Sequence, residues 1–307
     1  MAGRIVVVGS SNMDFVLRVP RLPVPGETLS GTDFQSLPGG KGANQAVAAA
    51  RLGASVSLIG CVGDDPFGTE LCARMSSDGI DISCVHRLPG VATGVACICV
   101  DAQGRNSIVL VPGANAALTP DHVRSAETLI ADAAVLVCQL EVPLETVAAA
   151  VDIAARNRVL VVLNPAPAQH IDRAVLAKID FLVPNESEAS LLAGSDVADL
   201  ASAQRAAAKL LDQGPRHVVT TLGARGVWLT GATGEFHAPA PRVDAVDTTA
   251  AGDTFIGGFS AALAAGDDLH GAVTLGQRAA ALSVTRFGAQ TSIPYRHELD
   301  ALPGDRA

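Results

Sequence analysis

The chain has 307 residues, of which 49% are hydrophobic and 17% charged, and this suits one large domain or one domain with an accessory element. Lys and Arg total 22 against 31 Asp and Glu, and the resulting net charge of −9 argues against a nucleic-acid partner. No apolar run reaches the roughly 18 residues that a membrane span needs, and nothing resembles a signal peptide. We therefore expect a cytoplasmic protein without a membrane partner.

The six cysteines form no C-x-x-C pair. Reduced thiols are therefore expected rather than disulfides or zinc ligands, and Cys97 and Cys99 are predicted to be core residues.

Apolar, strand-like runs alternate with alanine-rich helical patterns along the chain. Strands are predicted at 5–8, 56–59, 135–140, 159–163, 181–183, 217–222 and 227–230, and helices at 44–52, 66–78, 143–157, 171–179, 198–213, 254–265 and 268–285. Thr119 and Pro120 predict a further helix start, because Thr is a good cap and Pro suits the first helical position. Buried strands alternating with helices predict a mostly parallel sheet covered on both faces.

Two hairpin-like stretches interrupt the alternation. One pairs 13–19 with 27–36, and the other pairs 94–100 with 106–111. We expect a small antiparallel sheet, inserted at about 12–38 and 92–111 into a single domain that spans 1–307. Alone, these strands would expose an apolar sheet, so a homodimer joined through them is predicted.

The stretch 247–258 follows a probable extended run at 242–246 and opens an apolar helix. Ala250, Ala251 and Gly252 lie where that helix begins, and free N–H groups at a helix start attract anions. Asp253 could then take a proton from an attacking hydroxyl while these N–H groups hold a phosphoryl group. The alternative is an ordinary helix start in which Asp253 is a cap or a first-turn acid.

Other polar residues lie at the carboxyl ends of predicted strands, where open α/β sheets bind ligands. Any one of these residues alone is more often a helix cap or a solvated loop residue. Together with exposed backbone groups, they suit a ligand rich in hydroxyls. They are Asn12, Asp14 and Glu141, with Gly40, Lys41 and Asn44 in a glycine-rich loop that lacks the P-loop pattern.

Two later segments suit phosphate or nucleotide. Asn185 and Glu188 follow a strand and could hold the water shell of Mg²⁺, although an acidic helix N-terminus is an equal alternative. The segment 221–226 could pass under a nucleotide, with Arg225 reaching phosphate, or it could be a plain hairpin.

Both signatures of the ribokinase (PfkB) family of carbohydrate kinases are present, at 39–46 and 247–253. The chain resembles this family nearly end to end. The resemblance implies a ribokinase-like three-layer α/β/α sandwich whose inserted strands form a lid and the dimer contact. It also implies ATP-dependent phosphorylation of the 5-hydroxyl of D-ribose, with Mg²⁺ required and K⁺ as an activator.

The resemblance also implies roles for individual residues. Sugar would be held by Asn12, Asp14, Gly40, Lys41, Asn44, Glu141 and Asp253. Asp253 would be the base, with the backbone of 250–253 as an anion hole. Nucleotide and Mg²⁺ would be held by Asn185, Glu188, Thr221, Gly223, Arg225, Gly226 and Gln277. A monovalent cation would be held, partly through backbone carbonyls, by Asp247, Thr249, Ser283, Arg286, Gly288 and Ser292.

Gln277 departs from the family pattern, which commonly has Asn or His near the adenine, so the nucleotide preference stays open. Two alternatives to a ribose kinase also stay open. One is a kinase for 2-deoxyribose or another small sugar, and the other is a non-catalytic sugar sensor. The presence of Asp253, Glu188 and the small residues argues against a sensor.

Overall fold

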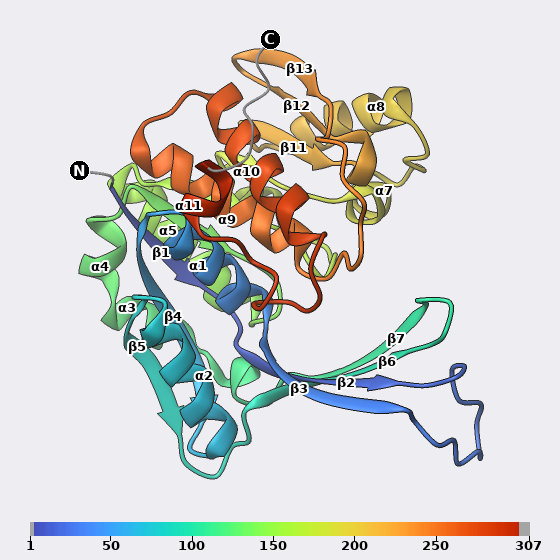
Figure 1. Cartoon of the computed structure of the whole chain (residues 1–307). Helices are drawn as coiled ribbons and strands as arrows, with labels where there is room; N and C mark the ends of the chain where they lie inside the picture. Colours follow the sequence, from blue (N-terminus) through green and yellow to red (C-terminus); the bar gives the residue numbers. More distant parts are fainter. Residues whose placement is uncertain (1–2, 301–307) are drawn as a thin grey trace.

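The computed structural model describes residues 3–300, and a large α/β body carries a small lid sheet that projects from it (Figure 1). The main sheet has nine strands in the order β13-β12-β11-β10-β9-β8-β1-β4-β5. Their bounds are β1 (Arg4–Val8), β4 (Ser55–Gly63), β5 (Asp81–Leu88), β8 (Val135–Cys138), β9 (Leu160–Leu163), β10 (Phe181–Leu182), β11 (His217–Thr221), β12 (Val227–Gly231) and β13 (Gly234–Ala238). All pairs are parallel except β11–β12 and β12–β13.

Helices cover both faces of this sheet, as the alternation in β1 illustrates. Ile5 and Val7 pack into one core, and Val6 and Val8 pack into the other. The first core contains α1 (Lys41–Arg51), α2 (Pro66–Ser77), α9 (Ala251–Ala265), α10 (Leu269–Ser283) and α11 (Arg296–Asp300). The second contains α3 (Pro120–Ser125), α4 (Glu127–Ala131), α5 (Leu144–Asn157), α6 (Arg173–Leu176), α7 (Glu186–Ala193) and α8 (Leu200–Leu211). The predicted three-layer sandwich is confirmed.

The lid is a four-stranded sheet in the order β3-β2-β6-β7. Its strands are β2 (Asn12–Arg18), β3 (Asp33–Gly39), β6 (Gly94–Val100) and β7 (Asn106–Val111). The two outer pairs are antiparallel, as predicted, but β2 and β6 are parallel. They start level with each other, since Asn12 pairs with Gly94, so both strands leave the body in the same direction. The prediction of a wholly antiparallel lid is therefore wrong.

Several predicted boundaries differ from the structure. No strand forms at 27–32 or at 242–246, and the helix predicted at 171–179 shrinks to α6. Two short 3₁₀ helices, Gly113–Ala117 and Gly223–Arg225, complete the fold. All six cysteines are free thiols, but Cys97 is exposed, so its prediction as a core residue is wrong. Within residues 3–300, no helix is both long enough and apolar enough to cross a lipid bilayer.

Candidate active site

The polar residues predicted at strand ends meet at one edge of the main sheet. Asn12 follows β1, Glu141 follows β8, and Asn185 follows β10. The carboxyl ends of parallel strands share one edge, which is why residues far apart in the chain converge here. The N-termini of α1 and α9 reach the same edge and add Lys41 and Asp253, which line one small cavity of about 210 Å³.

Asp253 is held at the start of α9 by amide side chains. Its side chain is 7% exposed, and its two carboxylate oxygens accept hydrogen bonds from Asn44 Nδ2 (3.0 Å) and Gln45 Nε2 (2.9 Å). Helix α9 begins earlier than expected, with Ala250 as its N-cap in the left-handed region at φ 57°, and no side chain of the described residues caps it. Asp253 is therefore not the cap, but it is an acid of the first turn, as the alternative also allowed.

The amides that orient Asp253 belong to a chain of buried side chains. Gln45 Nε2 also donates to Asn164 Oδ1 (3.2 Å), and Gln139 Nε2 donates to Gln45 Oε1 (2.6 Å). Gln290 Nε2 donates to Asn44 Oδ1 (3.2 Å). Sequence reasoning assigned no role to these four residues. Gln139 and Asn164 directly follow β8 and β9, so the strand-end rule could have found them, whereas nothing local marks Gln290.

Glycines let the lid strand and α1 approach each other beside this network. Gly40 has φ 88°, and a Cβ there would lie 2.7 Å from the backbone nitrogen of Asn12. A Cβ on Gly39 would lie 2.0 Å from Asp14 Oδ2. Glu141 Oε2 then accepts from the backbone N–H of Lys41 at 3.1 Å. The glycine-rich loop therefore brings Lys41 and Glu141 together beside the lid strand.

The other expected sugar ligands take different places. Asn12 is buried, and its Oδ1 accepts from Asn115 Nδ2 (2.7 Å). Asp14 lines a separate cavity of about 520 Å³ between the lid and the loops at 245–249 and 287–289.

Acidic groups dominate the electrostatics. Burial raises the pKa of Asp14 to about 7, and the negative charges of Glu141 and Asp253 act in the same direction. The pKa of the Lys41 ammonium is raised chiefly by the charge of Asp253, against the effect of burial. Lys41 is therefore a firmly charged cation in the small cavity, next to the proposed base.

A larger cavity of about 650 Å³ adjoins the small one. The two share Asn185, Thr221, Thr248, Ala251 and Gly252 in their walls. A Cβ on Gly252 would meet no described atom within 4 Å, so the space above the first turn of α9 is open. The larger cavity is also lined by Gly223, Gly226 and Gln277, as predicted for a nucleotide site.

Asn185 and Glu188 form a reciprocal cap on α7. Glu188 N donates to Asn185 Oδ1 (2.9 Å), and Asn185 N donates to Glu188 Oε2 (2.8 Å). Burial raises the pKa of Glu188. Both residues also line the small cavity, so they serve as a helix N-terminus and as part of the cavity wall.

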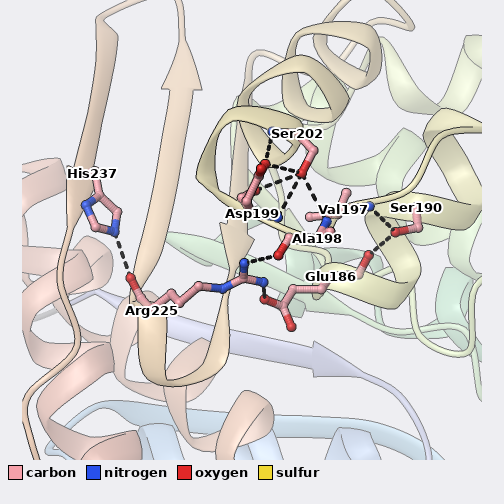
Figure 2. A network of polar contacts seen from close by, with 8 residues as sticks. All are labelled: Glu186, Ser190, Val197, Ala198, Asp199, Ser202, Arg225 and His237. Carbon is pink, nitrogen blue, oxygen red and sulfur yellow. Dashed lines mark hydrogen bonds and ion pairs between the residues drawn. The ribbon is translucent and has the colours of Figure 1, made fainter.

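Sequence reasoning predicts that Arg225 reaches phosphate, but the structure directs its guanidinium elsewhere. It binds the carboxylate of Glu186 and the carbonyl oxygen of Ala198, and these contacts join the β11–β12 turn to the segment around α7 (Figure 2). The backbone carbonyl of Arg225 contacts His237 Nε2 at 2.7 Å. Arg225 itself does not line the larger cavity, although its partner Glu186 does.

The residues expected around a monovalent cation lie together on loops beside α9. Asp247 accepts from the backbone N–H groups of Thr249 and Gly288, both at 2.9 Å. Burial alone would raise the pKa of Asp247, but these hydrogen bonds bring it below its usual value. The side chains of Ser283 and Ser292 donate to carbonyls at Ala280 and Ala289, and Arg286 pairs with Glu298. Arg286 can therefore offer a cation only its backbone carbonyl, whereas Ser283 and Ser292 can offer hydroxyl as well as carbonyl oxygens.

Comparison with known proteins places this geometry in a family. The family model described as pfkB family carbohydrate kinase matches residues 2–296. A ribokinase from Haemophilus influenzae is 47% identical over 298 residues, which cover 97% of each chain. A deoxyribokinase from Salmonella typhimurium is 40% identical over 292 residues, which cover 94% of this chain and 95% of that protein.

Solved structures agree with the family model. A ribokinase from Thermotoga maritima has a TM-score of 0.89 at 39% identity, over 97% of this chain and 98% of that one. A ribokinase from Arabidopsis thaliana, solved with ribose and ATP, has a TM-score of 0.87 at 31% identity over the same shares. The chain therefore belongs to the pfkB family of carbohydrate kinases.

Proposed function

We propose that this enzyme transfers the γ-phosphoryl group of ATP to the 5-hydroxyl of D-ribose and so forms ribose 5-phosphate. The observation that carries the proposal is the position of Asp253. Its carboxylate is aimed by two amides into the small cavity, beside the open first turn of α9 and next to the larger cavity. An acid poised between an acceptor pocket and an anion-binding helix start suits phosphoryl transfer to an alcohol.

Each group in the small cavity has a chemical role in this reaction. Asp253 accepts the proton of the attacking hydroxyl, and its hydrogen bonds from Asn44 and Gln45 hold the carboxylate in place. The free N–H group of Gly252 and the charge of Lys41 stabilise the negative charge on the transferring group. The network positions these groups before substrate arrives.

The residues present fit Mg²⁺ held mainly through water. Glu188 and Asp253 are carboxylates of the same small cavity, and Mg²⁺ usually keeps several waters and takes few protein ligands. Glu188 would hold that water shell, with Asn185 fixing its carboxylate. When bound, the ion neutralises phosphate charge.

The loops beside α9 also fit an activating K⁺. The backbone carbonyls of Asp247, Thr249, Arg286, Gly288 and Ser292 accept no hydrogen bond from within residues 3–300. Such unpartnered oxygens suit a large, weakly hydrated cation. Because Asp247 and Thr249 immediately precede the first turn of α9, the cation would steady the anion hole without touching the substrate.

Dimerisation through the lid is a further part of the proposal. On β7, Ile108, Val109 and Val111 are 56%, 63% and 53% exposed, and on β3 Phe34 is 60% exposed. A sheet with this much uncovered apolar surface favours association with a second copy. A cytoplasmic location and the absence of nucleic-acid and membrane partners also stay predictions.

A second sugar deserves direct comparison, because the deoxyribokinase relative is nearly as similar as the ribokinases. The test is kcat/KM for ribose, 2-deoxyribose and fructose on one preparation, with Asp14→Ala alongside. We expect ribose to exceed 2-deoxyribose by at least about tenfold, since a polar site is left unsatisfied when its partner hydroxyl is missing. Asp14→Ala should remove most of that preference. If 2-deoxyribose or fructose is best, the ribose assignment fails. Absence of turnover with every sugar would instead support a sensor.

A further inference from the structure

The two ends of the larger cavity differ in chemistry. One end is the open first turn of α9 that it shares with the small cavity. One face of α10 runs away from that end, with Val284 nearest to it, followed by Ala281, Ala280 and Gln277 at spacings of three, four and seven residues. The carbonyl of Val284 accepts from the backbone N–H of Asp247, which marks the phosphate end. Gln277 is seven residues earlier and therefore roughly 10 Å along the helix from it.

The surroundings of Gln277 suit a flat ring. Ala280 and Ala281 form one wall, and Val227, Pro241 and Val243 also line the cavity. Small and apolar side chains make a slot of the kind that takes a nucleotide base while the phosphates lie at the helix start. Gln277 contributes a polar group to this slot.

Neighbouring carbonyls determine how the Gln277 amide is turned. Its Nε2 donates to the carbonyl oxygen of Ala238 at 2.9 Å and to that of Pro239 at 3.4 Å. Carbonyl oxygens can only accept, so the NH₂ group must face them. The hydrogen bonds of this side chain within residues 3–300 all come from Nε2, so no donor reaches Oε1, and the half-buried side chain lines the cavity. The amide therefore offers the ligand a hydrogen-bond acceptor.

We propose that Gln277 determines base specificity by selecting a purine with an amino group at C6 and rejecting one with an oxo group there. Adenine carries such an amino donor, whereas hypoxanthine and guanine carry an acceptor oxygen at this position. Two facing acceptors repel, and the Ala238 and Pro239 carbonyls prevent the amide from turning over to compensate. This inference rests on the proposed function, because it takes the larger cavity as the nucleotide site.

The experiment compares ADP, purine riboside diphosphate and inosine diphosphate, which differ in the group at C6. Their affinities are measured by titration calorimetry, and kcat/KM is measured for ATP and inosine triphosphate with ribose. We expect ADP to bind at least about tenfold more tightly than inosine diphosphate, the scale of a mispaired buried polar group, with the purine compound between them. Gln277→Met, which keeps length but removes the amide, should reduce this ratio to within about threefold.

Gln213→Met is the matched control, because Gln213 also donates to a backbone carbonyl, that of Leu192, but lies away from the larger cavity. It should keep the wild-type ratio. Equal affinity of the wild type for ADP and inosine diphosphate would overturn the inference, as would an unchanged ratio in Gln277→Met. Binding with the expected selectivity but without phosphorylation of any sugar would overturn the proposed function and leave the inference standing. If no diphosphate binds, both fail.

Discussion

Replacing Asp14 with asparagine is expected to stabilise the folded protein while it weakens sugar binding. The carboxyl group is costly to ionise in its folded surroundings, because it is partly buried beside the charges of Glu141 and Asp253. Asparagine has nearly the same shape and carries no charge, so it removes this cost. It also removes the ionised acceptor that we assign to the sugar hydroxyls.

The size of the effect follows from the shift in pKa. Folding raises the pKa of Asp14 from 3.8 to about 7. A shift of this size corresponds to about 4 kcal/mol, and solvent screening of this partly exposed side chain reduces it to roughly 2 kcal/mol. The folded state holds the proton of Asp14 more tightly than the unfolded state does. The loss of folding stability caused by ionising Asp14 is therefore absent below about pH 4, grows as the pH rises, and is complete above about pH 7.

Urea unfolding without ligands at pH 5 and pH 8 measures this difference. The free energy of unfolding of Asp14→Asn should exceed that of the wild type by under about 1 kcal/mol at pH 5 and by about 2 kcal/mol at pH 8. The control is Asp132→Asn, the same change at an exposed position, which should alter stability by less than about 0.5 kcal/mol at both pH values. A difference in free energy of unfolding between the two proteins that stays constant with pH would refute the reasoning. An Asp14→Asn protein less stable than the wild type at pH 8 would also refute it.

Three other predictions concern catalysis, the cation and assembly. Asp253→Asn should leave ribose binding within a few-fold but lower kcat by at least roughly 10²-fold, the scale of general-base catalysis, and near-normal turnover in the folded variant would contradict it. K⁺ should activate the enzyme far more than Na⁺, and Asp247→Ala should reduce the activation by K⁺. Equal rates in K⁺, Na⁺ and a bulky organic cation at matched ionic strength would count against the cation site. Light scattering at micromolar concentration should give a dimer mass, and Val109→Lys on the exposed lid strand should give monomers; a monomeric wild type would exclude the lid dimer.

Local patterns predicted elements well where one local signal dominates. The bounds of β6 and β7 match the prediction because apolar residues run up to the turn at 101–105 on both sides. The strand β5 was not predicted, since its sequence mixes charged and apolar residues at the edge of the sheet. The start of α1 was placed three residues late because Gly42, a poor helix former, lies in its first turn and Gly40 is its N-cap.

Prediction of the site residues from the sequence was limited in a similar way. Asp253 and Asn44 could be identified from their own surroundings in the chain. Their partners could not, because Gln45 is 208 residues from Asp253 and Gln290 is 246 residues from Asn44, and only the tertiary fold brings them together. The contact of Arg225 could not be predicted for the same reason. Its guanidinium binds Glu186, which is 39 residues away in the chain and forms no part of the local motif.

The continuity of strand β2, which runs from the body to the outer lid, has a mechanical consequence. Strand β2 carries Asp14 near its base and Arg18 at its far end, where the guanidinium lies 5.2 Å from the ring centre of Phe287 in the loop near Asp247. A tilt of the lid would therefore move Asp14, the proposed sugar ligand, and shift Arg18 against Phe287, beside the proposed cation site, through one continuous strand. Sugar release and cation binding should then respond together to substitutions on the outer lid, far from either ligand. Substitutions on that surface should therefore change turnover without altering the chemical step.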